Sequence, residues 1–493
     1  MPEVHDLGLM IDSNIPIVVI ETAEELRAID TITRLSVSRN IPMYSWSITE
    51  GIQRLGFGFE MERDDKCQEP EAILEHIKKD RTAAIYVLCD FHPFLADSPK
   101  NIRLIKDIAM RKSRLGHTLI LLSHSLNIPP EIRSYSARLQ LRLPQPEHIL
   151  AIVREEASNW SRQNGRKVKT DYPTLQQLVK NLSGLTYDEV RRLCRSAIID
   201  DGAITESDLP EVNKAKFELM DMSSVLTYEF DTTSFQQVGG LHNLKQWLQT
   251  RDKVFNQGKD ASNIDPPKGI LLLGVQGGGK SLAAKAVAGA WHLPLLRMDV
   301  GSLYNKFFGE TEKNLRKALQ LAELMSPCVL WMDEIEKAFG QDAHDQGVSQ
   351  RMLGTLLTWL AEKTHPVFVV ATANKAHILP PELIRKGRLD EIFFVDFPDE
   401  ETRATIFRIH LQKRKFDPDL FTLSTLTRMT EGFSGAEIEQ AVVSAIYSAE
   451  ARAEKLTHDH IVHEISMTQP LSVVMAEDIA SLRAWAKDRT VKA

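Results

Sequence analysis

An eight-residue stretch, Gly-Val-Gln-Gly-Gly-Gly-Lys-Ser at positions 274–281, constrains the fold of this 493-residue chain more than any other feature. The apolar run 269–273 before it predicts a buried strand, and the alanine-rich run 281–290 after it predicts a helix. A strand, a glycine loop and a helix in this order indicate a phosphate-binding loop, in which backbone N–H groups and a helix N-terminus face an anion. We expect Lys280 to bridge the β- and γ-phosphates of a nucleotide and the Ser281 hydroxyl to hold Mg²⁺. A glycine-rich turn without a ligand is the alternative.

Two later strands are predicted to end in polar residues that suit the same chemistry. The apolar run 328–332 is followed by Asp333, which would accept a Mg²⁺-bound water, and by Glu334, which would orient and deprotonate the attacking water. Strands often end in solvated acids, but an acid pair about 50 residues after a phosphate loop is a specific signal. Asn374 ends the next predicted strand and is placed to bind the attacking water or the γ-phosphate. The sequence after Asn374 lacks the aspartate that would read guanine, which disfavours GTP.

The first 220 or so residues alternate strand-like and helix-like patterns, as in an α/β domain. The expected strands are 15–20, 43–47, 83–90, 117–123 and 138–144, with helices at 23–38 and after 147. Three segments of this half, at 128–133, 141–147 and 181–190, resemble segments at 379–385, 395–400 and 430–438. The order and the spacing of about 250 residues predict an ancient duplication, although general α/β sequence grammar also produces such junctions.

The first half lacks the residues that bind and hydrolyse a nucleotide. Its first strand is followed by Glu21-Thr-Ala-Glu-Glu25, which has no glycine or lysine and would repel a triphosphate. Its third strand ends in Asp90, which is followed by Phe91, so no second carboxylate stands there to position a water. A structural or partner-binding domain is therefore favoured over a second nucleotide site.

Composition and charge exclude several classes of protein. The net charge of −7 argues against a surface that as a whole binds nucleic acid. No apolar run reaches the roughly 18 residues of a membrane span, and the acidic N-terminus gives no secretory signal. We expect neither a membrane nor a nucleic-acid partner. Four widely spaced cysteines without a CxxC pair fit reduced thiols in the cytoplasm, and they suggest neither a disulfide framework nor a zinc site.

Taken in order, these motifs resemble those of the AAA ATPases, the ring-forming branch of the P-loop NTPases, over about residues 235–455. The segment 234–241 resembles the adenine-facing entry of that family, and 432–437 resembles the start of its sensor-2 helix, in the clade with Gly-Ala there. The segment 383–390 resembles the second region of homology, which implies that Arg385 and Arg388 are arginine fingers for a neighbouring subunit's site. The loop departs from the family pattern at Val275, Gln276 and Gly278, which predicts a looser loop and bears more on turnover than on binding.

The resemblance implies ATP and Mg²⁺ as cofactors and a set of site residues. The nucleotide-binding residues are Val238, Gly239, Gly274, Val275, Gln276, Gly277, Gly278, Gly279, Lys280, Ser281, Leu282, Gly435 and Ala436, the metal ligands are Ser281 and Asp333, and the catalytic residues are Glu334, Lys280, Asn374, Arg385 and Arg388. Phe307 and Phe308 resemble the family's pore-loop pair, which grips polypeptide in a central channel. Adjacent phenylalanines that only pack in a core are the alternative.

The whole chain also resembles the group within this family that plastid and cyanobacterial genomes encode as a hypothetical reading frame. This predicts an α/β fold with three domains: a degenerate AAA-like α/β domain at 1–222, an AAA core with a parallel sheet at 223–400, and a helical lid and tail at 401–493, frayed from Asp488. The location would be the cytoplasm, or the plastid stroma if the chain is plastid-encoded.

The predicted function is an ATP-driven ring, a hexamer by analogy with the family, that remodels or translocates a protein. An unknown protein would bind through residues 1–222. An ATP-gated scaffold with slow turnover is the first alternative, and a nucleic-acid motor or loader is the second.

Overall fold

The structure is a computed structural model. It describes residues 2–55, 63–64, 67–96, 98–220, 225–230, 232–233, 235–257, 264–303, 310–339, 346–385 and 387–493. The chain divides into two compact units: Met1–Pro144 with Thr186–Glu189, and Gln145–Leu185 with Val190–Ala493. The boundaries expected at 222/223 and 400/401 stay predictions. Among the described helices, none combines the length and the apolar character needed to cross a membrane.

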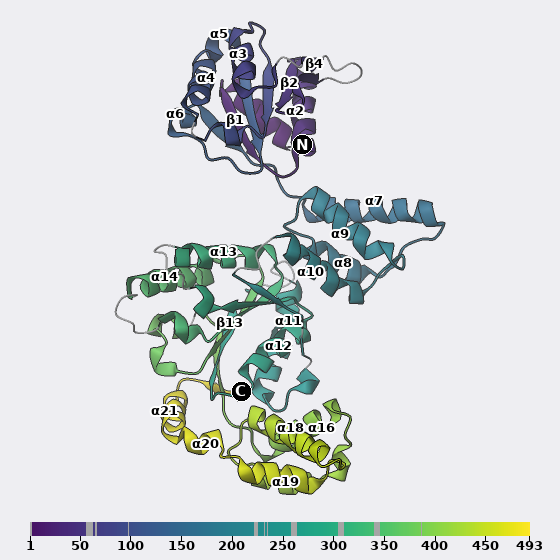
Figure 1. Cartoon of the computed structure of the whole chain (residues 1–493), viewed down its shortest axis with the longest axis vertical. Coiled ribbons are helices and arrows are strands. Elements are labelled where there is room, and N and C mark those ends of the chain that lie inside the picture. Colours follow the sequence, from purple (N-terminus) through teal and green to yellow (C-terminus); the bar gives the residue numbers. More distant parts are fainter. Residues whose placement is uncertain are drawn as a thin grey trace. The chain divides into compact units, whose positions relative to one another are not determined.

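The first unit, drawn in purple and blue in Figure 1, contains a seven-stranded sheet in the order β4-β3-β2-β5-β6-β1-β7. Its strands are β1 (Ile17–Glu21), β2 (Met43–Ser47), β3 (Gly51–Leu55), β4 (Arg63–Asp64), β5 (Ile85–Cys89), β6 (Thr118–Ser123) and β7 (Ser136–Leu139). The helices are α1 (Pro2–Asp12), α2 (Glu25–Arg39), α3 (Pro70–Lys79), α4 (Pro99–Met110), α5 (Lys112–Leu115) and α6 (Pro130–Arg133). All neighbours from β2 to β7 in this order are parallel, and β3 and β4 add an antiparallel edge. The strand expected at 138–144 lies earlier, because β7 pairs with β1 and its ladder ends where Ile20 meets Leu139.

The second unit begins with four helices and continues into a second seven-stranded sheet, in the order β10-β12-β13-β14-β11-β15-β16. The four helices are α7 (Pro146–Asn164), α8 (Tyr172–Asn181), α9 (Tyr187–Ile199), whose first turn belongs to the first unit, and α10 (Leu209–Leu219); the short strands β8 (Lys169–Thr170) and β9 (Ala203–Ile204) pair beside them. The strands of the large sheet are β10 (Thr227–Glu229), β11 (Gly269–Gly274), β12 (Leu295–Asp299), β13 (Cys328–Asp333), β14 (Val367–Ala373), β15 (Glu391–Val395) and β16 (Val491–Lys492). The helices beside it are α11 (His242–Gln257), α12 (Lys280–Trp291), α13 (Glu310–Leu324), α14 (Gln346–Glu362) and α15 (Pro381–Ile384).

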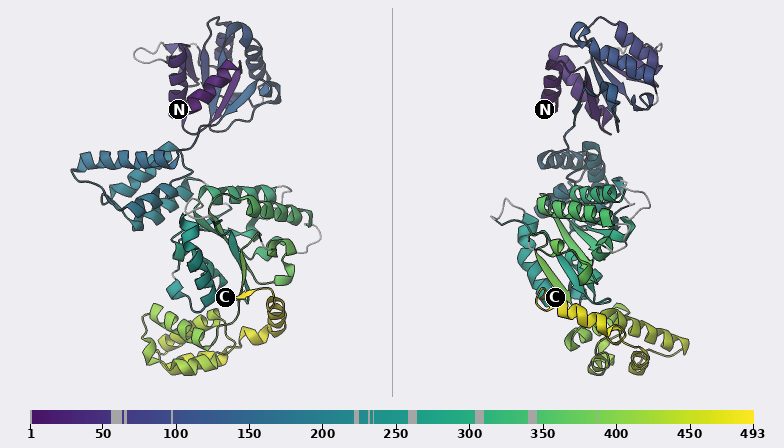
Figure 2. Two further views of the ribbon diagram at one scale, coloured as in Figure 1. Left: turned by 180° about the vertical axis from the view of Figure 1, so that it is seen from behind. Right: turned by 90° about the vertical axis from the view of Figure 1, so that its left-hand side faces the viewer.

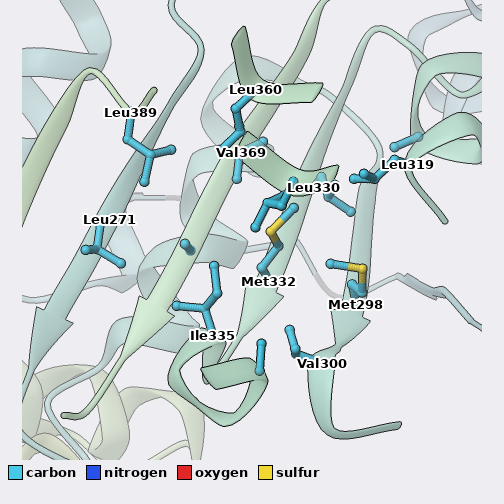
Figure 3. Close-up of a cluster of buried hydrophobic side chains, with 14 of the residues drawn as sticks. Leu271, Met298, Val300, Leu319, Leu330, Met332, Ile335, Leu360, Val369 and Leu389 are labelled. Atoms are coloured by element: carbon cyan, nitrogen blue, oxygen red, sulfur yellow. The ribbon is translucent and has the colours of Figure 1, made fainter. Parts of the chain in front are cut away.

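Alternate side chains of these parallel strands enter two separate apolar clusters, because successive residues of a strand point to opposite faces. Leu271, Leu330 and Val369 point to the face covered by α13 and α14, together with Leu319 and Leu360 of those helices (Figure 3). The neighbouring residues of the strands pack on the other face against α11 and α12. Helices therefore bury both faces, as a parallel sheet requires, and polar residues are left for the strand ends.

A helical lid follows β15 and is formed by α16 (Glu400–Lys413), α17 (Leu423–Met429), α18 (Gly435–Ala451) and α19 (His458–Met467) (Figure 2). The short helices α20 (Leu471–Val474) and α21 (Ala476–Ala486) then lead the chain back to the sheet. The expectation of a frayed end is wrong: β16 pairs in parallel with β15, and the Ala493 N–H donates to the Phe394 carbonyl at 3.0 Å. The exposed edge of β15 offers the backbone partners that order these last residues.

The five parallel strands have the same order in both units, which supports the predicted duplication. In the first unit the order is β2-β5-β6-β1-β7, and in the second it is β12-β13-β14-β11-β15. Backbone details agree as well, since Asp90 after β5 has φ 48° and Glu334 after β13 has φ 50°. The two positions therefore share a left-handed backbone conformation directly after corresponding strands.

In the first unit, the carboxylate of Glu24 stands between β1 and α2, where the second unit has its glycine loop. It is buried and accepts hydrogen bonds from the backbone N–H groups of Tyr187 at 2.7 Å and Asp188 at 3.3 Å, in the first turn of α9. Its other oxygen pairs with Arg27 at 2.7 Å. An acidic side chain thus occupies the N-terminus of α9, where a negative charge is stabilised by the helix dipole and by unpaired N–H groups.

Candidate functional site

The glycine loop after β11 has the backbone that only glycine permits at several positions. A Cβ at Gly274 would lie 2.0 Å from the Val395 carbonyl oxygen, so no side chain fits there. Gly277 and Gly279 have φ values of 74° and 93°, which L-residues with side chains rarely adopt. The loop then enters α12 at Lys280, so the N–H groups at the helix start directly follow those of the loop.

Lys280 is almost fully buried beneath the loop. Its Nζ donates to the carbonyl oxygens of Gly274 at 2.9 Å and Val275 at 2.7 Å. Burial lowers the pKa of this lysine to about 8, and the nearby carboxylates of Glu336, Asp333 and Glu334 oppose that shift. The ammonium group is therefore a desolvated cation with acceptors from its own loop, and a phosphate would be a stronger acceptor for the same protons.

Asp333 lies at the carboxyl end of β13 and is held on both oxygens. The Thr372 hydroxyl donates to Oδ1 at 2.8 Å, and the Arg297 guanidinium pairs with Oδ2 at 2.8 Å. The same threonine oxygen accepts the Glu334 N–H at 3.1 Å, so it fixes the turn between the two acids. Arg297 and Thr372 were not among the predicted site residues.

Glu334 and Asn374 are in direct contact. The Asn374 side-chain amide donates to Glu334 Oε1 at 3.2 Å, and Lys337 pairs with the other oxygen. The Asn374 N–H donates to Glu336 Oε1 at 2.8 Å, while Glu336 Oε2 is buried with no hydrogen-bond partner in the described part of the chain. Glu336 is a buried acid close to Lys280 that the sequence analysis did not single out.

A cavity of about 950 Å³ joins the loop, the acids and the lid. Its lining includes these predicted site residues: Val238, Gly239, Gln276, Gly277, Gly278, Gly279, Lys280, Ser281, Leu282, Asp333, Glu334, Asn374, Gly435 and Ala436. Gly274 and Val275 lie in the loop but not on the cavity wall. His410 and Glu439 of the lid also line it and were not predicted. Burial lowers the pKa of His410, with the Glu439 carboxylate opposing the shift at 3.4 Å.

The first turn of α18 lies directly against the glycine loop. The Ala436 N–H points to the Gly277 carbonyl at 3.4 Å, and a Cβ on Gly277 would lie 2.9 Å from Ser434 Oγ. Ser434 and Glu437 form a reciprocal capping box at this helix start. A ligand in the cavity would therefore touch the loop and the lid together.

The predicted arginine fingers do not belong to this cavity. Arg385 is exposed, and Arg388 donates to the Leu357 carbonyl; neither lines the cavity. Phe307 and Phe308 lie outside the described residues, so the pore-loop role stays a prediction. The roles of the other site residues also stay predictions, although the structure brings those of the loop, the acid pair and Asn374 together.

A buried lysine under a glycine loop at the N-terminus of a helix, with an acid pair after a parallel strand that one further strand separates from the loop's strand, defines a P-loop nucleoside triphosphatase. The family model of the ATPase family associated with various cellular activities (AAA) matches residues 270–397. The models of the N-terminal and second domains of SpoVK-like AAA ATPases match residues 3–141 and 147–223.

Individual relatives agree with these matches. The AAA domain-containing protein ycf46 of Trieres chinensis is 34% identical over 99% of this chain and 97% of its own length. The protein of the same name from Pyropia yezoensis is 35% identical, over 98% of this chain and 97% of its own length. The proteasome-activating nucleotidase of Sulfurisphaera tokodaii is 36% identical over 60% of this chain and 74% of its own length.

The chain therefore belongs to the AAA ATPase family, and it is similar along nearly its whole length to the ycf46 proteins. The predicted fold class is confirmed: an AAA core with a parallel sheet and a helical lid, preceded by an AAA-like α/β region. The protein is an ATPase, as predicted.

Proposed function

We propose that the cavity binds ATP with Mg²⁺, with the triphosphate on the glycine loop and Lys280. The Ser281 hydroxyl and the Asp333 carboxylate are hard oxygen donors of the kind that Mg²⁺ prefers. When bound, Mg²⁺ would neutralise charge on the phosphate oxygens. Lys280 would exchange its two backbone acceptors for phosphate oxygens, and the adenine side of the nucleotide would lie toward Val238 and Gly239.

Glu334 is the proposed general base. It must accept the proton of an attacking water, yet one oxygen is bonded to Asn374 and the other is paired with Lys337. Both partners are side chains that can rotate, so binding of the γ-phosphate to Asn374 would release the carboxylate toward the water. The contact between Asn374 and Glu334 thus couples recognition of the γ-phosphate to activation of the water.

The observation that carries the proposal of a ring is that the cavity is complete except for the arginines. The loop, the acid pair and Asn374 line it, whereas Arg385 and Arg388 do not. An arginine that reaches the γ-phosphate contributes about 10³-fold or more to the rate of hydrolysis, so a site without one is slow. We propose that a neighbouring subunit supplies these residues and that the ring is a hexamer.

For this ring we propose a protein substrate, drawn past Phe307 and Phe308, and a partner protein that binds residues 1–222. One relative is named as a proteasome-activating nucleotidase, and this name supports the proposal of a protein substrate. The proposed location is the cytoplasm, or the plastid stroma for a plastid-encoded chain.

The test is ATP turnover per subunit over a wide range of protein concentration, with the Glu334→Gln variant as the blank. We expect specific activity to rise steeply with concentration, because the site is completed by assembly. Activity that is flat and well above the blank, in a protein that light scattering shows to be monomeric, would overturn the role of the arginines.

A mixing experiment separates a missing arginine from a damaged fold. Arg385→Ala and Glu334→Gln proteins should each be nearly inactive alone. Mixed rings should regain activity, because some Arg385→Ala subunits, with Glu334 intact, then face an intact arginine of the other variant. No recovery in rings that are shown to be mixed would contradict action between subunits.

An ATP-gated scaffold is the second candidate. It is favoured by the two bonds that restrain Glu334, since these slow the activation of water more than the binding of ATP. ATP binding without turnover in a fully assembled ring, with or without added protein substrates, would favour it. A nucleic-acid motor ranks third, because the chain is acidic as a whole.

A further inference from the structure

Three side chains with metal-binding atoms gather at the carboxyl ends of β5 and β6 in the first unit. Asp90 and His92 follow β5, and His124 follows β6. One ligand atom from each residue lies within 4.8 Å of the other two. None of the three belongs to the ATPase site, and the cluster was not predicted from the sequence.

A buried hydroxyl group orients two of these side chains. Ser123 Oγ donates to Asp90 Oδ1 at 3.3 Å and lies 2.5 Å from Nδ1 of His92. In the tautomer that carries its proton on Nδ1, His92 donates to Ser123 Oγ, and the lone pair of Nε2 is then available for a cation. Hydrogen bonds of this kind from outer groups orient the ligands of metal sites.

The second imidazole stands next to the first. The rings of His92 and His124 meet edge to face, with centroids 4.8 Å apart. His124 is exposed, so its side chain is free to rotate toward Asp90 and His92. Ligand atoms about 2.0–2.2 Å from one zinc ion are at most roughly 4.4 Å apart, so a small rotation is enough.

The helix start beside the cluster differs in charge from its counterpart in the second unit. Glu25 opens α2 where Lys280 opens α12, so a carboxylate stands in place of the cation that holds phosphate. The Glu25 carboxylate accepts a hydrogen bond from the Cys89 thiol, directly before Asp90 in the chain. The carboxyl end of this sheet therefore favours a cation and repels a nucleotide.

We propose that Asp90, His92 and His124 bind one divalent transition-metal ion of the zinc type. Two imidazoles with one carboxylate suit zinc and its neighbours, whereas Mg²⁺ and Ca²⁺ prefer oxygen ligands alone. Ser123 is a positioning residue for Asp90 and His92. Three protein ligands leave a further position for water or for a side chain of a bound partner.

The test is a calorimetric titration of the full-length, tag-free chain with Zn²⁺, in the presence of excess Mg²⁺ and ADP to keep the ATPase site filled. We expect one tight Zn²⁺ ion per chain. His124→Ala and Asp90→Asn should each weaken its binding by about tenfold or more. The matched control is His76→Ala, which removes an exposed histidine of α3 outside the cluster and should bind Zn²⁺ as the wild type does.

Thermal unfolding gives a second readout. Zn²⁺ should stabilise the wild type and the control but not the His124→Ala chain, because a ligand stabilises only a fold that binds it. Equal melting of all chains without metal would show that the variants fold. Equal Zn²⁺ affinity in the wild type, His124→Ala and Asp90→Asn, or no Zn²⁺ binding to the wild type, would overturn the proposal.

Discussion

The two sheets of this protein share five parallel strands in one order, but the residues at their carboxyl ends differ in charge and in partners. In the second unit a glycine loop lies above the buried ammonium group of Lys280, a combination that suits an anion. In the first unit Glu24 and Glu25 occupy the same junction, and Glu24 is already bonded to the first turn of α9. The comparison shows that the fold does not depend on its nucleotide chemistry, because side chains at the strand ends can be exchanged without altering the buried strands.

The largest effect is expected from the acid after β13. Glu334→Gln should lower kcat by about 10²–10⁴-fold, because the amide cannot take the proton of the attacking water. ATP affinity should be kept. The control in the first unit is Glu131→Gln, a change of an exposed acid of α6, which should leave turnover unchanged. Steady-state phosphate release measures kcat for both variants. A large loss of kcat in Glu131→Gln would contradict the assignment of catalysis to the second unit alone.

The next effect concerns the first turn of α9. Glu24→Ala removes a charged acceptor from two backbone N–H groups, and each such bond is worth about 1.5–3 kcal/mol. Hydrogen exchange at Tyr187 and Asp188 should therefore become faster by one to two orders of magnitude, or roughly 2 kcal/mol. Glu24→Gln keeps an acceptor oxygen and should show a smaller change. Unaltered exchange in Glu24→Ala would mean that this carboxylate does not hold the helix start.

How far the sequence predicts this site depends on how local each signal is. The loop at 274–281 and the acids at 333 and 334 stand at fixed positions on single elements, so periodicity and spacing place them correctly. Arg297 reaches Asp333 only because β12 and β13 are neighbours, and no spacing reveals that pairing. His410 and Glu439 enter the cavity from the lid, and β16 is ordered by the edge of a distant strand. The sequence pattern therefore did not predict contacts between elements that are distant in the chain.

ATP affinity measured over a pH series tests the charge of Lys280, which stands where the first unit has Glu25. Burial lowers the pKa of Lys280 to about 8, below its ordinary value. The lysine is therefore charged below pH 8 and loses its charge above it, so ATP affinity should be level at low pH. Above pH 8 it should fall by up to about tenfold per pH unit. Adenosine, which has no phosphate, is the control ligand, and an equal fall for adenosine would assign the titration to another group.

The smallest effect compares two equivalent helix caps. Thr186 accepts the Glu189 N–H at 3.3 Å, and Ser434 accepts the Glu437 N–H at the same distance. Thr186→Ala and Ser434→Ala should each destabilise their helix start by about 1 kcal/mol, as measured by hydrogen exchange. Only Ser434→Ala should also alter ATP affinity, because Ser434 lies against Gly277 of the loop. Altered ATP affinity in Thr186→Ala would refute this separation.

The bond from Glu24 to α9 means that the two junctions differ in how they depend on a ligand from solution. An anion that is part of the chain is present at a fixed effective concentration and never dissociates, so its contact with the helix start is indifferent to the supply of ATP. An anion that must bind from solution joins loop and lid only for as long as it is retained. The contact at the start of α9 therefore stays the same whatever the supply of ligand, whereas a contact between loop and lid through a bound anion would vary with that supply.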